Sequence, residues 1–246
     1  MKLLVVDDYQ ALSRAGADLV ADFINARPDA RVVVATGRTP MGLYRELAAR
    51  RGRGQLDASP LRVFQLDAYL GLGPGDPRSL YRWMERSFLD PLGISERRVV
   101  RLPGDAPDPE GACRAYDRAL QAAGGFDLAV LGLGPNGHLG FNEPPCGREA
   151  PTRVVSLTPQ SVESNARYWG GPEQVPRRAL TAGMAVLLTA RRILLLAAGE
   201  SKADILRRTL EGPINPDVPA SYLQTVPGVT VIADRAAAGL LHASAR

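Results

Sequence analysis

The sequence predicts an α/β fold with a single doubly wound, mostly parallel sheet and helices on both faces, a modified Rossmann-like arrangement. Short apolar, β-branched runs recur along the 246 residues without polar alternation, as strands buried on both faces require. Amphipathic segments separate these runs, and such alternation of strand and helix is typical of a parallel sheet. No repeat, low-complexity stretch or long linker interrupts the chain, so we expect one domain over residues 1–246.

Each expected element follows from its own stretch of sequence. The apolar runs predict strands at Arg31–Ala35, Arg62–Leu66, Arg98–Leu102, Asp127–Leu131, Arg153–Leu157, Arg192–Ala197 and Val229–Ala233. The amphipathic segments predict helices at Tyr9–Asn25, Pro40–Arg51, Ser79–Leu89, Pro109–Ala122 and Lys202–Glu211.

Composition narrows the class of protein. The net charge is only +4 and no run of five basic residues occurs, so we expect no nucleic-acid partner. No apolar run reaches the roughly 18 residues of a membrane span. The first residues lack the apolar core and cleavage site of a signal peptide. With Cys113 and Cys146 as the only cysteines, a disulfide framework is not expected. These features favour a cytoplasmic protein without membrane attachment.

Four loops that follow predicted strands carry polar or small residues. They are Thr36–Pro40, Asp67–Tyr69, Gly132–His138 and Gly199–Lys202. Ligands of open α/β sheets bind in the crevice beyond the carboxyl ends of the strands. We therefore expect these loops to converge on one ligand site, and their convergence is stronger evidence than any single motif.

Two of the loops are suited to an anion. Thr36, Gly37, Arg38 and Thr39 lead into a helix with Thr39 as its expected N-cap and Pro40 at its first position, so free N–H groups would face the crevice. An ordinary capped turn explains this pattern equally well.

Lys202 is the second anion-binding candidate. We expect Ser201 to begin its helix, with Asp204 completing a capping box and Lys202 in the first turn, where the helix dipole disfavours a cation. Lys2 and Lys202 are the only lysines among 30 basic residues. A lysine kept in that unfavourable place indicates a bound phosphate or carboxylate.

Two further loops carry acid–base groups. Asp67 directly follows a buried strand and could be a general base on a carbon acid, although a loop-capping aspartate would look the same. His138 lies five residues before Glu143 and two after Asn136. A carboxylate that fixes the imidazole tautomer would make a proton relay, and the alternative is a histidine of the core. The second histidine, His242, is expected on the surface.

Three other interpretations of these residues are not favoured. Gly132, Gly134 and Gly137 match a dinucleotide fingerprint, but Pro144 and Pro145 prevent the helix that the fingerprint must open. The glycines instead let the backbone wrap closely around a small substrate. No zinc-type spacing occurs, so no metal is expected. No Gly-x-Ser-x-Gly elbow supports a serine nucleophile.

Together these residues resemble the glucosamine-6-phosphate deaminase/isomerases, which are grouped with the 6-phosphogluconolactonases. The resemblance covers nearly the whole chain. It rests on Thr36–Pro40, Leu66–Tyr69, Gly132–Pro144, Ser164–Arg167, Val175–Pro176, Ala179–Gly183, Ser201–Lys202 and Pro219–Gln224, which stand in the family's order. The stretch Gly137–Pro144 is the most specific of these.

The resemblance implies a reaction without a cofactor on a sugar phosphate. His138, tuned by Glu143, would open the ring of a 2-amino sugar 6-phosphate. Asp67 would then move a proton from C2 to C1, and hydration of the resulting imine would release ammonia and fructose 6-phosphate. The phosphate would be held by Thr36–Thr39, Arg167 and Lys202.

Three departures from the family's pattern bear on these expectations. Asn136 stands where many members have aspartate; it can orient His138 but carries no charge to offset an imidazolium. Ala68 replaces an acid that often follows the catalytic aspartate. At the phosphate site of allosterically activated members, where a serine, an arginine and a lysine are used, this chain has Cys146, Arg153 and Val155, so we expect no activation.

The resemblance leaves other activities open. Phe141–Pro144 and Leu66–Tyr69 favour the deaminase over a lactonase of the same fold, which would hydrolyse an ester. A third hypothesis is a regulator that binds a sugar phosphate without catalysis, but the chain has no appended DNA-binding helices to support it. A galactosamine 6-phosphate enzyme would look the same in sequence, and the chain could be a monomer or a homo-oligomer.

Overall fold

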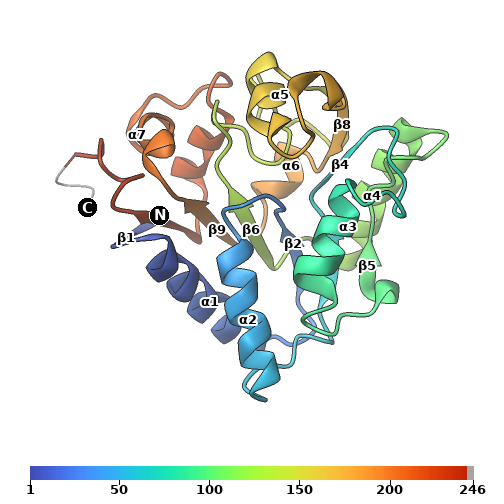
Figure 1. The fold of residues 1–246 in the computed structure, drawn as a ribbon, viewed down its shortest axis with the longest axis horizontal. Helices are drawn as coiled ribbons and strands as arrows, with labels where there is room; N and C mark the ends of the chain where they lie inside the picture. Colours follow the sequence, from blue (N-terminus) through green and yellow to red (C-terminus); the bar gives the residue numbers. More distant parts are fainter. Residues whose placement is uncertain (243–246) are drawn as a thin grey trace.

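The computed structural model describes residues 1–242, and Figure 1 shows their fold. Within the described residues, seven strands form a parallel sheet in the spatial order β1-β10-β9-β6-β2-β3-β5. These strands are β1 Lys2–Val6, β2 Arg31–Val34, β3 Arg62–Gln65, β5 Val99–Val100, β6 Leu128–Gly132, β9 Arg192–Ala197 and β10 Val229–Asp234. The predicted α/β class is confirmed, with β1 added and the expected strand at Arg98–Leu102 reduced to two residues.

Helices cover both faces of this sheet, with α1 and α2 on one face and α4 on the other. The helices of residues 1–242 are α1 Tyr9–Ala26, α2 Met41–Gly52, α3 Leu80–Met84, α4 Pro109–Ala123, α5 Pro159–Ala166, α6 Met184–Leu187 and α7 Ala203–Glu211. A π-helical turn, η1 Glu85–Leu89, continues α3, and short 3₁₀ turns lie at η2 Glu96–Arg98, η3 Pro172–Gln174, η4 Glu200–Lys202 and η5 Pro219–Thr225. No helix of residues 1–242 is long and apolar enough to cross a membrane.

Side chains of each strand alternate between two cores. In β2, Val32 and Val34 join the core that α1 and α2 cover, which includes Leu12 and Leu43. Val33 points to the opposite core, where it joins Tyr116 of α4. Because both faces of the sheet are buried, the strands are apolar throughout and show no polar alternation. Helices α1 and α2 pack side by side on their face (Figure 1).

A second, three-stranded sheet lies next to the main one and was not predicted. It contains β4 Asp67–Tyr69, β8 Arg178–Thr181 and β7 Arg153–Ser156, paired antiparallel in that order. The prediction that Arg153–Leu157 joins the parallel sheet was therefore wrong. Strand β7 is an edge strand whose residues are half-buried or exposed, so its apolar run fits one covered face rather than two.

The order of the strands in the main sheet sets the position of the ligand site. Moving from β2, the chain continues to β3 and β5 on one side, whereas β6, β9 and β10 lie on the other. The strand order thus reverses between β2 and β6. The carboxyl ends of strands at such a reversal leave a crevice that open α/β sheets use for ligands.

Candidate active site

A cavity of about 140 Å³ opens where β2 and β6 end. The loops after β2 and β6 line it, together with β4, the end of α5 and Lys202. Of the predicted site residues, it is lined by Thr36, Gly37, Arg38, Thr39, Asp67, His138, Arg167 and Lys202. A neighbouring hollow of about 570 Å³ shares Arg38, Thr39, Arg167 and Lys202 with it. The four loops therefore converge as the sequence predicts.

One end of the cavity offers free backbone donors. Gly37 adopts a positive φ of 95°, a conformation that glycine takes without strain. No described residue accepts a hydrogen bond from the backbone N–H groups of residues 36–39. The expected cap was wrong in detail, because Pro40 occupies the N-cap position of α2 and no side chain caps it. Free N–H groups in front of a helix N-terminus suit an anion.

Two cations face the same end of the cavity. Lys202 is half-buried, and burial followed by the positive charge of Arg167 lowers its pKa to about 8. Arg167 ends α5, and its guanidinium lies 4.9 Å from the ring centroid of Tyr168. Neither cation has an ion-pair partner among the described residues. An anion placed between them would relieve their mutual repulsion.

The predicted capping box around Lys202 was wrong. Lys202 itself ends the 3₁₀ turn η4 and is the N-cap residue of α7, so Ser201 caps nothing. Asp204 pairs with Arg207 at 3.0 Å and is on the exposed side of the helix. The position of Lys202 in the cavity nevertheless agrees with the anion-binding role that its rarity suggested.

Asp67 also lines the cavity, from the start of β4. The Gln65 amide donates to the Asp67 carbonyl at 2.8 Å, which fixes the backbone there. The side chain is only 7% exposed, and its Oδ1 has no hydrogen-bond partner among residues 1–242. Burial raises the pKa of this carboxyl to about 7. A loop-capping aspartate would accept backbone hydrogen bonds, so the capping alternative does not fit, whereas a general base near neutrality does.

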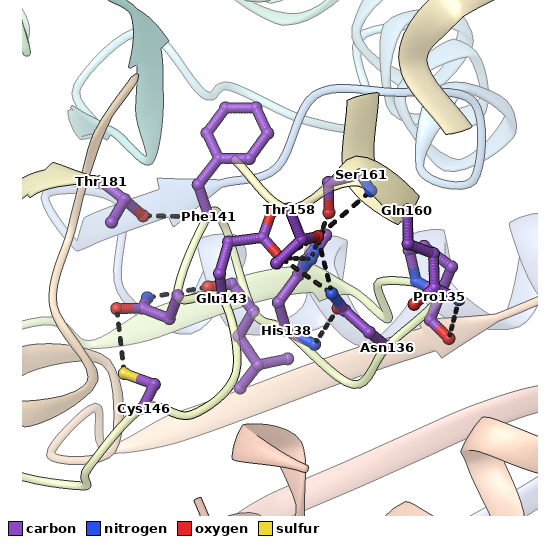
Figure 2. A network of polar contacts seen from close by, with 12 residues as sticks. Pro135, Asn136, His138, Phe141, Glu143, Cys146, Thr158, Gln160, Ser161 and Thr181 are labelled. Carbon is purple, nitrogen blue, oxygen red and sulfur yellow. Dashed lines mark hydrogen bonds and ion pairs between the residues drawn. The ribbon is translucent and has the colours of Figure 1, made fainter. Parts of the chain in front are cut away.

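His138 is held by a network of polar side chains (Figure 2). Its Nδ1 lies 3.3 Å from Glu143 Oε2, and both side chains are buried. The predicted His138–Glu143 pair is therefore formed. Burial of Glu143 disfavours its charge, but hydrogen bonding and charge from His138, with help from Ser161 and Asn136, outweigh burial and lower its pKa to about 2.

Asn136 has a different role in this network from the one that the sequence predicts. Its amide Nδ2 donates to Glu143 Oε2 at 2.8 Å and to Thr158 Oγ1 at 3.2 Å. Its Oδ1 accepts only from the backbone N–H of His138, at 3.3 Å. Asn136 thus orients the carboxylate of Glu143 rather than the imidazole of His138.

The glycines of this loop serve packing more than substrate contact. Gly137, with φ at 85°, does not line the cavity, and a Cβ there would lie 2.8 Å from Val218. A Cβ on Gly134 would lie 2.3 Å from His138 Nε2, so Gly134 gives the imidazole edge its space at the cavity wall. No helix follows this segment before β7, in agreement with the prediction that it is not a dinucleotide fingerprint.

Sequence reasoning missed Thr158 and Ser161, which contact Glu143 and His138. A signal was present: a threonine before Pro159 is a helix start, and Thr158 caps α5 by accepting from the Ser161 N–H. Aromatic residues that line the cavity, among them Tyr69 and Phe141, were missed as well. No group of three or more metal-ligating side chains occurs within residues 1–242.

Arg153, which the sequence suggested as the one remaining residue of an activator site, already makes hydrogen bonds within the chain. Its guanidinium donates to Asn142 Oδ1 at 2.8 Å and to Cys146 Sγ at 3.2 Å. Both partners are buried. An added anion would have to compete with these internal hydrogen bonds.

His242 is exposed, as expected, and its Nδ1 lies 2.5 Å from Glu211 Oε2.

Comparison with known proteins places this geometry in context. Residues 7–232 match the model of the family described as glucosamine-6-phosphate isomerases/6-phosphogluconolactonase. A glucosamine-6-phosphate deaminase of Halothermothrix orenii is 42% identical over 98% of this chain and all of its own. One of Streptomyces avermitilis is 44% identical over 98% of this chain and 93% of its own.

Solved structures agree in fold. A monomeric glucosamine-6-phosphate deaminase superposes with a TM-score of 0.95 at 40% identity, over 98% of this chain and all of the other. A 6-phosphogluconolactonase from Trypanosoma cruzi superposes with a TM-score of 0.79 at 20% identity, over 98% of this chain and 96% of the other. The second likeness concerns the fold alone.

Proposed function

The chain belongs to the family of glucosamine-6-phosphate isomerases and 6-phosphogluconolactonases, and within it we propose that it is a glucosamine-6-phosphate deaminase. The observation that carries the proposal is Asp67, a buried carboxyl without a partner for Oδ1, on the wall of the same cavity as His138. A pKa of about 7 suits a base that takes a proton from carbon and returns it.

The reaction would begin at the ring of glucosamine 6-phosphate. The phosphate binds to the loop of residues 36–39 with Arg167 and Lys202, which fixes the sugar by its far end. His138 takes the proton of the C1 hydroxyl and gives one to the ring oxygen, so the ring opens to the aldehyde. Glu143 holds Nδ1 of His138 during this transfer.

Asp67 would carry the next step. It removes the C2 proton while His138 gives a proton to the aldehyde oxygen, forming an enol-amine, and it then delivers the C2 proton to C1. The amine nitrogen returns a proton to His138, which leaves an imine at C2. Water adds to the imine carbon and ammonia leaves, so glucosamine 6-phosphate and water give fructose 6-phosphate and ammonia. Every proton that moves comes from substrate, water, His138 or Asp67, and the reaction as proposed uses no cofactor.

A lactonase function would explain fewer features of this site. Lactone hydrolysis breaks an ester and removes no proton from carbon, so it leaves the buried, partner-free Asp67 without a task. The deaminases of Halothermothrix orenii and Streptomyces avermitilis are 42% and 44% identical to the chain, against 20% for the lactonase. A preference for galactosamine 6-phosphate remains the second candidate within the same chemistry.

One experiment separates these activities. The purified protein is incubated with glucosamine 6-phosphate, galactosamine 6-phosphate or 6-phosphogluconolactone, while ammonia and acid release are followed. We expect one ammonia for each fructose 6-phosphate formed from glucosamine 6-phosphate. Acid release from the lactone above its spontaneous rate, without ammonia from either amino sugar, would refute the proposal. Binding of the amino sugar phosphates without turnover would assign a regulator instead.

A further inference from the structure

Ser161 contacts the catalytic histidine from a place that no solvent reaches. It lies in the first turn of α5, is 0% exposed, and its Oγ lies 3.3 Å from His138 Nδ1 (Figure 2). The same nitrogen lies 3.3 Å from Glu143 Oε2. One imidazole nitrogen is therefore shared between a carboxylate and a hydroxyl, and both contacts are long for hydrogen bonds.

The remaining members of the network limit what Ser161 can do. Thr158 Oγ1 donates to Glu143 Oε2 at 3.0 Å and accepts from the Asn136 amide and the Ser161 N–H, which fills its capacity. Glu143 Oε2 already accepts from Thr158 and Asn136. Glu143 Oε1 is buried and has no partner within residues 1–242. The carboxylate thus still has unfilled acceptor sites, and a hydrogen bond from Ser161 is one of the causes that lower its pKa.

A hydroxyl between a carboxylate and an imidazole has two possible arrangements. It can donate to the carboxylate and accept from Nδ1–H, which leaves the lone pair on Nε2. It can instead donate to Nδ1, which puts the proton on Nε2. A carboxylate accepts hydrogen bonds but does not donate them, and a charged acceptor makes the stronger bond. In the first arrangement the Glu143 carboxylate accepts a further hydrogen bond, and in the second arrangement it does not.

We propose, on the basis of the deaminase function above, that Ser161 is a positioning residue for His138. Its hydroxyl donates to Glu143 and accepts, together with Glu143, the Nδ1 proton of the imidazole. The ring is then fixed in the tautomer whose Nε2 lies along Gly134 at the cavity wall with a lone pair available for ring opening. Ser161 does not touch substrate.

The position of Ser161 on α5 has a further consequence. Thr158 begins this helix and Arg167 ends it. The first turn of α5 therefore contacts the His138–Glu143 pair, and the C-cap residue of the helix, Arg167, places its guanidinium at the phosphate end of the cavity. Loss of the Ser161 hydroxyl should disturb the imidazole while leaving Arg167 in place, so kcat and KM should respond differently.

The tautomer can be measured without reference to activity. The chain has only two histidines, so ¹⁵N-histidine labelling gives two imidazoles, and His242→Gln identifies the signals of His138. We expect His138 to carry its proton mainly on Nδ1 in the wild type. In Ser161→Ala that fraction should fall, because a single long contact to Glu143 is left. A wild-type imidazole protonated on Nε2, or an unchanged tautomer in Ser161→Ala, would overturn the proposal.

Two more variants separate hydrogen bonding from packing. Ser161→Cys keeps the shape of the side chain, with a somewhat larger atom, but hydrogen-bonds weakly, so it should resemble Ser161→Ala. Ser161→Thr keeps the hydroxyl and should retain the wild-type tautomer. Ser13→Ala is the matched control, because Ser13 is also a buried helical serine, 4% exposed, whose hydroxyl donates only to the Tyr9 carbonyl. If Ser161→Cys retains the wild-type tautomer, the role is one of packing and the proposal fails.

Kinetics complete the test. We expect kcat for glucosamine 6-phosphate to fall on the order of tenfold in Ser161→Ala with KM little changed. This loss is smaller than the roughly 10²–10⁴-fold contribution of general acid–base catalysis, because His138 itself remains. A rise in KM alone would contradict the proposal. Should the wild type not release ammonia at all, the deaminase function fails, while the tautomer measurement still reports on Ser161.

Discussion

Replacing Asp67 by asparagine should inactivate the enzyme and at the same time make its stability less dependent on pH. The side chain is 7% exposed, and burial raises the pKa of this carboxyl from 3.8 to about 7. At 1.36 kcal/mol for each pKa unit, this difference corresponds to about 4 kcal/mol by which the ionised carboxylate destabilises the fold. Asparagine has almost the same size but never carries this charge.

The sign of the pH dependence follows from proton linkage. Between pH 3.8 and about 7, Asp67 is protonated in the folded protein and ionised in the unfolded chain. The unfolded state then binds fewer protons, so the free energy of unfolding falls as pH rises through this range. From pH 5 to pH 8 the Asp67 contribution to that fall should be about 2–3 kcal/mol. It is absent in Asp67→Asn.

Urea unfolding of wild type and Asp67→Asn at pH 5 and pH 8 measures this contribution. Other titrating groups are common to both proteins and cancel in the difference. We expect the variant to gain about 2–3 kcal/mol relative to wild type between the two pH values, with kcat reduced on the order of 10²–10⁴-fold. A relative stability that does not change with pH would refute the raised pKa, and wild-type exchange of the C2 proton in the variant would refute the role of base.

Four other predictions concern the rest of the site. Lys202→Ala should raise KM for glucosamine 6-phosphate more than it lowers kcat, by roughly 10–150-fold if a charge-assisted contact of about 1.5–3 kcal/mol is lost; an equal effect on unphosphorylated glucosamine would contradict the phosphate assignment. The pH profile of kcat/KM should rise through about pH 7 as Asp67 ionises and fall above about pH 8 as Lys202 loses its proton. In Lys202→Arg the fall at high pH should disappear, and its persistence would assign that limb to another group. Asn136→Asp should lower kcat rather than raise it, because its carboxylate would replace the amide that donates to Glu143 at 2.8 Å; a faster variant, measured by ammonia release, would show that Asn136 limits the enzyme. Rates should be hyperbolic in substrate and insensitive to N-acetylglucosamine 6-phosphate, since Arg153 is already bonded to Asn142 and Cys146; a Hill coefficient above one that falls on adding this sugar would identify an activator site elsewhere.

The main sheet could be predicted because its strands are buried on both faces and therefore carry an unbroken apolar signal. The same reasoning failed for β7, whose sequence Arg-Val-Val-Ser is also apolar at its centre but lies at the edge of the second sheet. Strand β4 has only three residues, too few for any periodicity, and β1 is half-buried and ends at two aspartates. The pattern of apolar residues indicates how deeply a strand is buried. It does not indicate which neighbouring strand it pairs with, and only the folded structure shows that.

The site was predictable to a different degree at its two ends. Lys202 and the loop of residues 36–39 were identified from residue type and position, although the helix caps proposed for them do not form. The relay around His138 was found only in part. Ser161 and His138 are 23 positions apart in the sequence. No sequence pattern near either residue indicates that they are in contact. Asn136 was found, but its direction toward Glu143 depends on Thr158, which lies beyond the loop.

Two carboxyl groups in one site are given opposite properties by their surroundings. Glu143 accepts hydrogen bonds from Asn136 and Thr158 and pairs with His138, so it stays ionised, with a pKa of about 2. Asp67 is as well buried but has no partner for Oδ1, and its pKa is about 7. The first can orient an imidazole without exchanging protons, and the second can exchange protons near neutral pH. In the proposed reaction, this division lets one site combine ring opening with proton removal from carbon. An amide at Asn136 fits this division, because a further carboxylate beside Glu143 would raise the pKa of the group that stays ionised.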